Sequence, residues 1–475
     1  MNRVGRFFAQ VANSFRRHFN VTVLRRVTAR FTDFFTEPRK RAALRRFIAR
    51  FTGFLRRRRN LIVLLFAIFV IGGGEELWMR FVPKYLQALG VTALIIGLYD
   101  GLRTSLSAVY AYRGGVLVKL WGYRRVFIVL NLVSIAGYAL VLFIPNWGGA
   151  IAGMVLFLSW SCVSLPATFS LLAATLAAER HAVGVGAQSV IGHLPIIVAP
   201  FLGGMLIDRF GVIPGVRIAL MISILLSAAT IFVQWQLREK PSDMAPPEPA
   251  GPGVGAPQTE RWSVWRNVRE FNYPLRRLLV SDVLIGACER IPYAWVVIFA
   301  MDYIGMSGKE VGMLITVEMV VAALCIMPAS RIGEKFSPEP FVIVLFILFA
   351  LFPIALLRAH GFTTLALAFA IRGLKECGVE RHKALVIGYC KPGQREQMAG
   401  AYFLVRDLIV SVAALAGAYL WSLEPRLNLV AAVILGVVGT LFYIRTIQHT
   451  RATAPPIVLY GRRPPTAANE NKWET

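Results

Sequence analysis

Charged side chains occur inside several long apolar blocks of this sequence, as at Glu75 and Glu76. A charge at the centre of a bilayer costs about 2.5–3.5 kcal/mol on insertion scales, so each must face a partner or a wettable cavity. Carboxyl groups in such a cavity can exchange protons, which predicts proton coupling and substrate binding. The candidate residues are Glu75, Glu76, Asp100, Arg103, Glu289, Arg372, Lys375, Glu376, Glu380, Arg406 and Asp407.

Two of these acids, Glu75 and Glu289, occupy equivalent places in similar stretches. Ile-Gly-Gly-Gly-Glu ends at Glu75 and Ile-Gly-Ala-Cys-Glu ends at Glu289, an offset of 214 residues. Such a repetition is typical of transporters built from two duplicated halves. We therefore expect Glu75 and Glu289 to be the main proton sites. Glu76 points about 100° away from Glu75 around a helix, and we expect it to pair with the helix near 93–118 or near 186–207.

Basic and acidic residues also share one face of the helix expected near 362–389. Arg372, Glu376 and Glu380 are spaced four apart, which places them one turn from each other. Across a cavity, Arg372 or Lys375 is placed to meet Glu75 or Glu289. The alternative for every charged residue is a static ion pair between helices. Nearby aromatic residues are expected mainly to pack or to lie at the membrane interface, with a binding surface as the alternative; they are Trp78, Tyr85, Tyr99, Tyr293 and Trp295.

The elements that position these residues are apolar blocks. Hydrophobic residues make up 56% of the 475 residues, above the roughly 45–50% of soluble chains. Blocks of about 20 residues match the length of a helix that crosses about 30 Å of hydrocarbon. The expected spans are 60–86, 93–118, 125–146, 148–177, 186–207, 214–236, 277–303, 309–330, 339–358, 362–389, 396–421 and 426–446.

A proline-rich stretch separates the spans into two sets of six. It contains prolines from Pro241 to Pro257 and lacks a helical period until about Trp262, so it is expected to be a linker. The expected organisation is a basic N-terminal segment (1–59), a first six-helix bundle (60–236), a cytoplasmic linker (237–275), a second six-helix bundle (276–447) and a cytoplasmic tail (448–475).

The N-terminal segment carries 17 Arg or Lys residues and two acids. Apolar residues from Phe7 to Val23 recur at spacings of one to four residues, which is typical of an amphipathic helix on anionic lipid. We do not expect nucleic-acid binding, because the segment runs directly into a membrane span. A transit peptide is less favoured, because Ser14 is its only serine. The Lys/Arg bias of the loops places both termini in the cytoplasm of a multi-pass inner-membrane protein.

A glycine- and arginine-bearing loop follows the second span. It runs from Gly115 through Gly122 to Arg124 and Arg125. The loop resembles the G-x-x-x-D-R-x-G-x-R-R signature of the major facilitator superfamily, although Lys119 stands where the family has Asp. In that family the acid latches the outward-open state. The resemblance therefore implies a latch that is weak here or built otherwise.

The fifth span carries a second resemblance, around Pro200, Gly203 and Gly204. It is similar to the G-P-x-x-G-G signature of antiporters in the same family, with close packing of small residues as the alternative. A partial copy of the loop signature runs from Gly204 through Asp208 to Gly211. We expect this copy to form a simple turn.

The resemblance implies an all-α membrane protein with twelve transmembrane helices in two pseudo-symmetric six-helix bundles, the major facilitator fold. It implies a secondary active transporter that moves a small solute by alternating access. Coupling to protons is expected, with export by antiport favoured over import. A metal- or organic-ion importer of the same fold and a non-transporting scaffold with a lipid- or partner-binding arm are the alternatives. Neither a phosphate loop nor the G-x-S-x-G or H-E-x-x-H motif occurs, and the five cysteines lack metal-site spacing, so we expect no enzyme, cofactor or bound metal.

Overall fold

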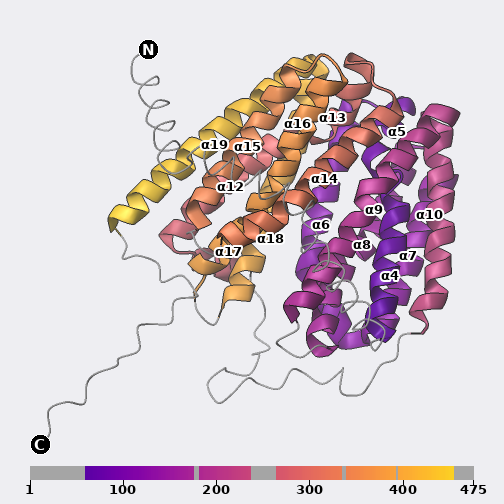
Figure 1. Ribbon diagram of the computed structural model, residues 1–475, viewed down its shortest axis with the longest axis horizontal. Helices are drawn as coiled ribbons and strands as arrows, with labels where there is room; N and C mark the ends of the chain where they lie inside the picture. Colours follow the sequence, from indigo (N-terminus) through magenta and orange to yellow (C-terminus); the bar gives the residue numbers. More distant parts are fainter. Residues whose placement is uncertain (1–58, 176–180, 237–263, 334–337, 392–393, 454–475) are drawn as a thin grey trace, which may run out of the picture. The chain divides into compact units, whose positions relative to one another are not determined.

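The computed structural model describes residues 59–175, 181–236, 264–333, 338–391 and 394–453, and the secondary structure in these ranges is helical (Figure 1). The chain divides into two units, Met1–Ile62 and Val63–Thr475. Almost all of the described residues belong to the second unit. The expected amphipathic segment, most of the expected linker and the end of the tail lie outside the described residues.

The first half of the described chain contains helices at the six expected positions. The first expected span is broken after Glu76, where the chain continues as a short 3-10 helix and then as a helix with Pro83 in its first turn. Proline is favoured there because it lacks the N–H that a first turn leaves unpaired. The elements are α4 (Arg59–Glu76), η1 (Met79–Phe81), α5 (Val82–Ala88), α6 (Ala93–Trp121), α7 (Tyr123–Phe143), α8 (Trp147–Thr175), α9 (His181–Phe210) and α10 (Val212–Gln234).

The second half follows the same plan. Its first long helix ends one residue after Pro292, and the chain continues as shorter helical pieces to Tyr303. A short helix, α11, lies inside the stretch expected to be linker. The elements are α11 (Val264–Arg269), α12 (Tyr273–Tyr293), α13 (Trp295–Ile298), η4 (Phe299–Tyr303), α14 (Gly308–Gly333), α15 (Pro338–Leu357), α16 (Phe362–Leu374), α17 (Glu376–Tyr389), α18 (Arg395–Leu423) and α19 (Pro425–Thr453).

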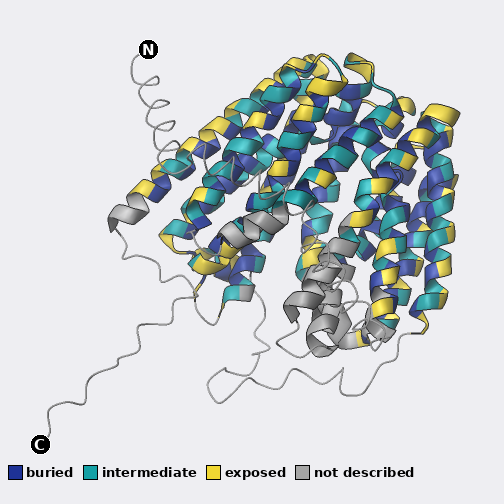
Figure 2. Ribbon diagram, viewed as in Figure 1, coloured by how far each residue is buried: buried dark blue, intermediate teal, exposed yellow. Residues whose placement is uncertain are grey.

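Several of these helices have the length and the surface of membrane spans. Within the described ranges, six are long and apolar enough to cross a bilayer. Large apolar side chains lie on their outer faces, and Leu225, Phe232 and Val412 are 69%, 74% and 61% exposed (Figure 2). Exposed apolar surface of this kind suits contact with lipid, whereas it would be unfavourable in water.

The two halves meet along two helix pairs, α6 with α18 and α9 with α14. Small residues line both contacts. On α6, a Cβ added to Gly101 would lie 2.8 Å from the carbonyl oxygen of Ser411 on α18. Small side chains permit such close backbone approach between helices in a membrane. These pairs bring the inner helices of both halves around a common centre.

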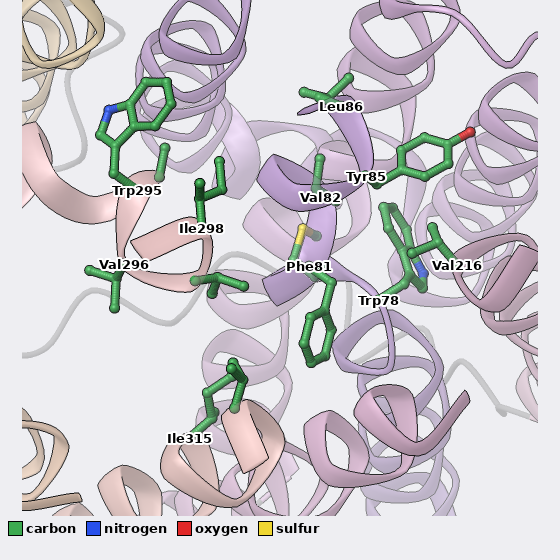
Figure 3. Close-up of a cluster of buried hydrophobic side chains, with 14 of the residues drawn as sticks. Trp78, Phe81, Val82, Tyr85, Leu86, Val216, Trp295, Val296, Ile298 and Ile315 are labelled. Carbon is green, nitrogen blue, oxygen red and sulfur yellow. The ribbon is translucent and has the colours of Figure 1, made fainter. Parts of the chain in front are cut away.

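An apolar core lies around the break after α4 (Figure 3). Trp78 is 1% exposed, donates a hydrogen bond to the Ser223 hydroxyl at 3.2 Å and packs edge-on against Phe157. Tyr85 and Trp295 are also buried in this core. The packing interpretation therefore holds for these three aromatic residues. The core fixes the segment that follows Glu76, and with it the position of Arg80.

Candidate functional site: a charged pocket between the two halves

A pocket lies between residues of both halves, and it consists of two adjoining hollows that share Tyr293, Val296 and Arg372. We call it the central pocket. η1 and α6 line it from the first half, and α12, α16 and the junction between α16 and α17 line it from the second. Its charged and tyrosine lining residues are Arg80, Tyr99, Asp100, Arg103, Glu289, Tyr293, Arg372 and Lys375.

Tyr293 is the centre of this arrangement. Arg80 lies 3.5 Å from its hydroxyl, and Arg103 also donates a hydrogen bond to that hydroxyl. The guanidinium carbons of Arg290 and Arg372 lie 4.6 Å and 5.3 Å from the centre of its ring. Cations are attracted to the negative face of an aromatic ring. One tyrosine therefore collects four arginines from both halves of the chain.

Most of the basic side chains in and beside the central pocket are also paired with an acid. Lys375 binds Glu289, which is one of the four pairings that the sequence left open. Arg290 reaches Asp100 across the two halves at 3.4 Å. Such pairing offsets the cost of burying both charges. The remaining pairs are Arg80 with Glu76 at 3.2 Å, Arg372 with Glu318 at 3.2 Å, and Lys375 with Glu376 at 3.9 Å.

The acids Glu76 and Glu318 hold their arginines from outside the pocket, because neither is among its lining residues. Glu318 is 2% exposed. A ligand in the central pocket would therefore meet guanidinium groups before it met these carboxylates. The expectation that Glu76 pairs with a neighbouring helix is wrong, since its partner Arg80 lies four residues along the same chain segment.

Glu75 has a different environment. It is 8% exposed, and the Ser161 hydroxyl on α8 lies 2.8 Å from each of its carboxylate oxygens. In the described part of the chain no cation lies within ion-pair distance of Glu75. Arg103 and Tyr99 interact with it electrostatically from the pocket side. Glu75 thus stands beside the central pocket as a buried carboxyl group held by a neutral donor.

Other predicted site residues lie elsewhere. Arg406 and Asp407 on α18 pair with each other at 2.7 Å and do not line the central pocket. Asp282 lies near Arg406 and accepts a hydrogen bond from the Tyr402 hydroxyl at 2.6 Å. Sequence reasoning placed Arg406 and Asp407 in the cavity because it could not tell which face of α18 they occupy. The side chain of Glu380 lies outside the described residues, and Glu376 is half-buried beside the pocket.

Sequence reasoning left Arg80, Arg290 and Glu318 out of the candidate site residues, and it gave Tyr293 only as an alternative binding-surface residue. Tyr293 is one of 14 tyrosines, and Glu318 stands alone in an apolar stretch. The signal available for Glu318 was its charge in a block expected to span the membrane. For Tyr293 the signals were its nearness in sequence to charged residues and its place four residues after Glu289, one helical turn away.

The conformational motifs have distinct settings. Gly122 adopts φ 77° before α7, a conformation that suits glycine, while Arg124 is half-buried and Arg125 is exposed. The side chains around Gly115 and Lys119 lie outside the described residues. On α9 Pro200 is buried, and a Cβ added to Gly203 or Gly204 would collide with the carbonyl oxygen of Leu77 or of Gly308. The geometry of the α9 motif is thus one of close packing.

A model of the Major Facilitator Superfamily matches residues 64–306 and 278–469. The "Multi-drug resistance efflux pump PmrA homolog" of Lactococcus lactis is 26% identical over 190 residues, which are 38% of this chain and 45% of that relative. The "Multidrug resistance protein MdtG" of Escherichia fergusonii is 22% identical over 304 residues, 60% of this chain and 69% of that relative. The alignment thus spans less than half of the first of these relatives.

Solved structures share the fold. The nucleoside transporter NupG superposes with a TM-score of 0.62 at 12% identity, covering 82% of this chain and 98% of that one. A bacterial homologue of the human lysosomal transporter Spinster, in an inward-facing and unoccupied conformation, gives a TM-score of 0.60 at 13% identity over 84% and 98%. The expected fold class is confirmed by these matches.

Proposed function

This chain belongs to the major facilitator superfamily and is a secondary transporter of the membrane, and we propose that it couples the export of a small solute to the proton gradient. Export is supported by a relative named as a homologue of a multi-drug resistance efflux pump, and a second relative is named as a multidrug resistance protein. The cargo would bind in the central pocket, which residues of both halves line. Alternating access would then expose this pocket to one side of the membrane at a time.

The observation that carries the proton coupling is the setting of Glu75. Its carboxyl group is buried, accepts a hydrogen bond from the Ser161 hydroxyl and lacks an ion-pair partner among the described residues. A carboxyl group without a paired cation can exist in either protonation state at moderate cost, whereas Lys375 holds Glu289 in its charged form. Of the two acids in equivalent repeat positions, Glu75 is therefore the better proton site.

Transport in liposomes tests this proposal. Purified protein would be reconstituted with a pH-sensitive dye inside, and a panel of organic cations, neutral solutes and organic anions would be offered with and without a pH gradient. We expect a proton gradient that drives protons in the direction opposite to the solute to accelerate the movement of the solute. Glu75→Gln should abolish this acceleration and preserve exchange of solute without a gradient.

A matched control is Glu424→Gln, which neutralises an exposed acid at the end of α18. This variant should respond to the gradient as the parent protein does. Gradient-driven transport of full rate in Glu75→Gln would contradict the assignment of the proton site. An absence of any flux across the panel would contradict the carrier itself.

The arginines of the central pocket favour a second candidate, an organic-anion importer. Arg80, Arg103 and Arg372 line the pocket together with a single acid from the first half, Asp100. An anion on Arg103 and a proton on Glu75 would favour each other's binding, because a neutral Glu75 leaves the guanidinium to the anion. Anion and proton would then move together, which in a cell drives import.

The same transport assay separates the two candidates. An exporter driven by exchange alkalises the compartment into which the solute moves, while cotransport of anion and proton acidifies it. A hard-cation importer is disfavoured by the geometry, because Asp100 and Glu289 are held by Arg290 and Lys375. The scaffold alternative depends on residues outside the described ranges and would be supported if deletion of 1–50 alone abolished function.

A further inference from the structure

The carboxylate of Asp208 joins the two halves at one end of the helices. Asp208 lies at the end of α9, and α14 begins at Gly308. One carboxylate oxygen of Asp208 accepts the Gly308 N–H at 2.6 Å, and the other accepts the Lys309 N–H at 2.8 Å. The first N–H groups of a helix have no partner within the helix, and they attract anions. Asp208 therefore closes the start of a helix that belongs to the other half.

The sequence at the start of α14 leaves these two N–H groups to Asp208. Ser307 and Glu310 form a reciprocal capping box, in which the Glu310 carboxylate accepts the Ser307 N–H at 2.8 Å and the Ser307 hydroxyl accepts the Glu310 N–H at 3.2 Å. Between them, Gly308 and Lys309 keep their N–H groups free of local side chains. The cap of α14 is thus completed only when α9 is in place.

Glycines make this approach possible. A Cβ on Gly204 would overlap the carbonyl oxygen of Gly308, and a Cβ on Gly312 would lie 2.6 Å from the Cα of Phe201. One turn further along, the Thr316 hydroxyl donates to the carbonyl oxygen of Ile197 at 2.7 Å. The contact is therefore a backbone-to-backbone seam with Asp208 at its end.

No other group in the described ranges forms an ion pair or a side-chain hydrogen bond with the Asp208 carboxylate. Its side chain is exposed, and no basic side chain of the described residues lies within ion-pair distance of it. The neighbouring Arg209 instead places its guanidinium 5.6 Å from the ring centre of Phe210. The two hydrogen bonds to α14 are consequently the contacts that neutralisation of Asp208 would remove.

The motif around Asp208 is the copy of the loop signature that the sequence led us to expect as a simple turn. That expectation is wrong, because the acid reaches across to the other half. The first copy of the signature has Lys119 in place of this acid. The last residues of α6 and of α9 lie at opposite ends of their bundle. Between them the chain crosses the bundle three times, along α7, α8 and α9. The chain therefore lacks the acid at one end and has it at the other.

We propose that Asp208 is a conformational latch, which holds the halves together at the α9–α14 end and must release when this end opens during transport. A second contact assists it at the same end, where Lys84 and Gln87 on α5 both bind Asp302 on η4. The proposal rests on the chain being a carrier, and it is independent of the direction of transport and of proton coupling.

Distance measurements between spin labels test the latch. In a background without the five native cysteines, labels at Leu94 and Leu423, both exposed at this end of α6 and α18, report whether the end is closed. We expect the full-length protein in liposomes to populate mainly the short distance. Asp208→Asn, which loses the charge but keeps the shape, should shift the ratio of long to short distances about tenfold towards the open state.

Arg209→Gln is the control, because it removes the adjacent charge without touching α14. It should leave the distance distribution as in the parent. Equal distributions for Asp208→Asn and the parent, or equal shifts for both variants, would overturn the latch. Thermal unfolding of both variants separates a shifted conformational equilibrium from a misfolded protein. Asp208→Ser is a second variant without the charge, and it should shift the distance distribution in the same direction as Asp208→Asn. Loss of proton-driven flux with an intact distance shift would count against the proposed function and leave the latch standing.

Discussion

Ser161 on α8 donates its one hydroxyl hydrogen to Glu75 on α4, where both carboxylate oxygens lie 2.8 Å from the hydroxyl oxygen. This contact ties two helices of the first half together beside the central pocket. It is the structural feature that distinguishes Glu75 from Glu289, whose partner is a lysine. The stabilising effect of a neutral donor on a buried carboxyl group is measurable by a mutant cycle.

We expect Ser161→Ala to destabilise the protein by about 1–3 kcal/mol, because a buried carboxyl group would lose its hydrogen-bond donor. In a Glu75→Ala background the same change should cost much less, since nothing remains to be satisfied. Unfolding in detergent of the two single variants and the double variant gives the coupling energy. Additive effects would mean that the two side chains do not interact as described.

The pair between Lys375 and Glu289 gives a stronger effect of the same kind. Lys375→Met should destabilise the protein by about 3 kcal/mol, the lower end for a buried pair, because Glu289, whose side chain is 29% exposed, would keep a half-buried charge without its partner. Combining it with Glu289→Gln should recover most of that loss. Chemical unfolding of the three variants is the measurement, and a double variant no more stable than Lys375→Met would refute the pairing.

The hydroxyl of Tyr293 is predicted to organise the arginines that meet the cargo. Tyr293→Phe keeps the ring against Arg290 and Arg372 but removes the acceptor that Arg80 and Arg103 share. We expect KM for transport to rise roughly tenfold, which corresponds to about 1.4 kcal/mol of binding free energy. Thermal stability should change little.

Tyr419→Phe serves as the control for this prediction, since Tyr419 is 62% exposed on α18. Its transport kinetics should match those of the parent. An unchanged KM in Tyr293→Phe would show that the hydroxyl does not contribute to cargo binding.

Close packing of α9 predicts which glycines tolerate a side chain. Gly203→Ala should destabilise the protein by about 1–3 kcal/mol, because its methyl group would collide with the Leu77 carbonyl oxygen. Gly72→Ala on α4 has no atom within 4 Å of the added Cβ and should be neutral or stabilise by about 0.5–1 kcal/mol. Melting temperatures of the two variants compare them directly, and equal destabilisation would argue against the close contact between Leu77 and α9.

The sequence alone predicted the helical fold and the positions of the long helices. Apolar blocks of the right length determine this, because backbone groups in hydrocarbon must pair within a helix. Breaks within the first, seventh and tenth spans escaped prediction, although Pro83 and Pro292 lie near the first two. The sequence predicted that charges in apolar spans need partners, and it left the pairing of Lys375 with Glu289 as one of four alternatives.

Only the tertiary structure decided which charges meet. Helix rotation and crossing place Arg406 and Asp407 in a separate cluster, gather four arginines at Tyr293, and turn Asp208 from an expected turn residue into a cap on the other half. Sequence periodicity determines which residues share a helix face, but it does not determine which neighbour that face contacts. The repeated Glu75 and Glu289 show the same limit, because equivalent positions in the chain acquired different partners in space.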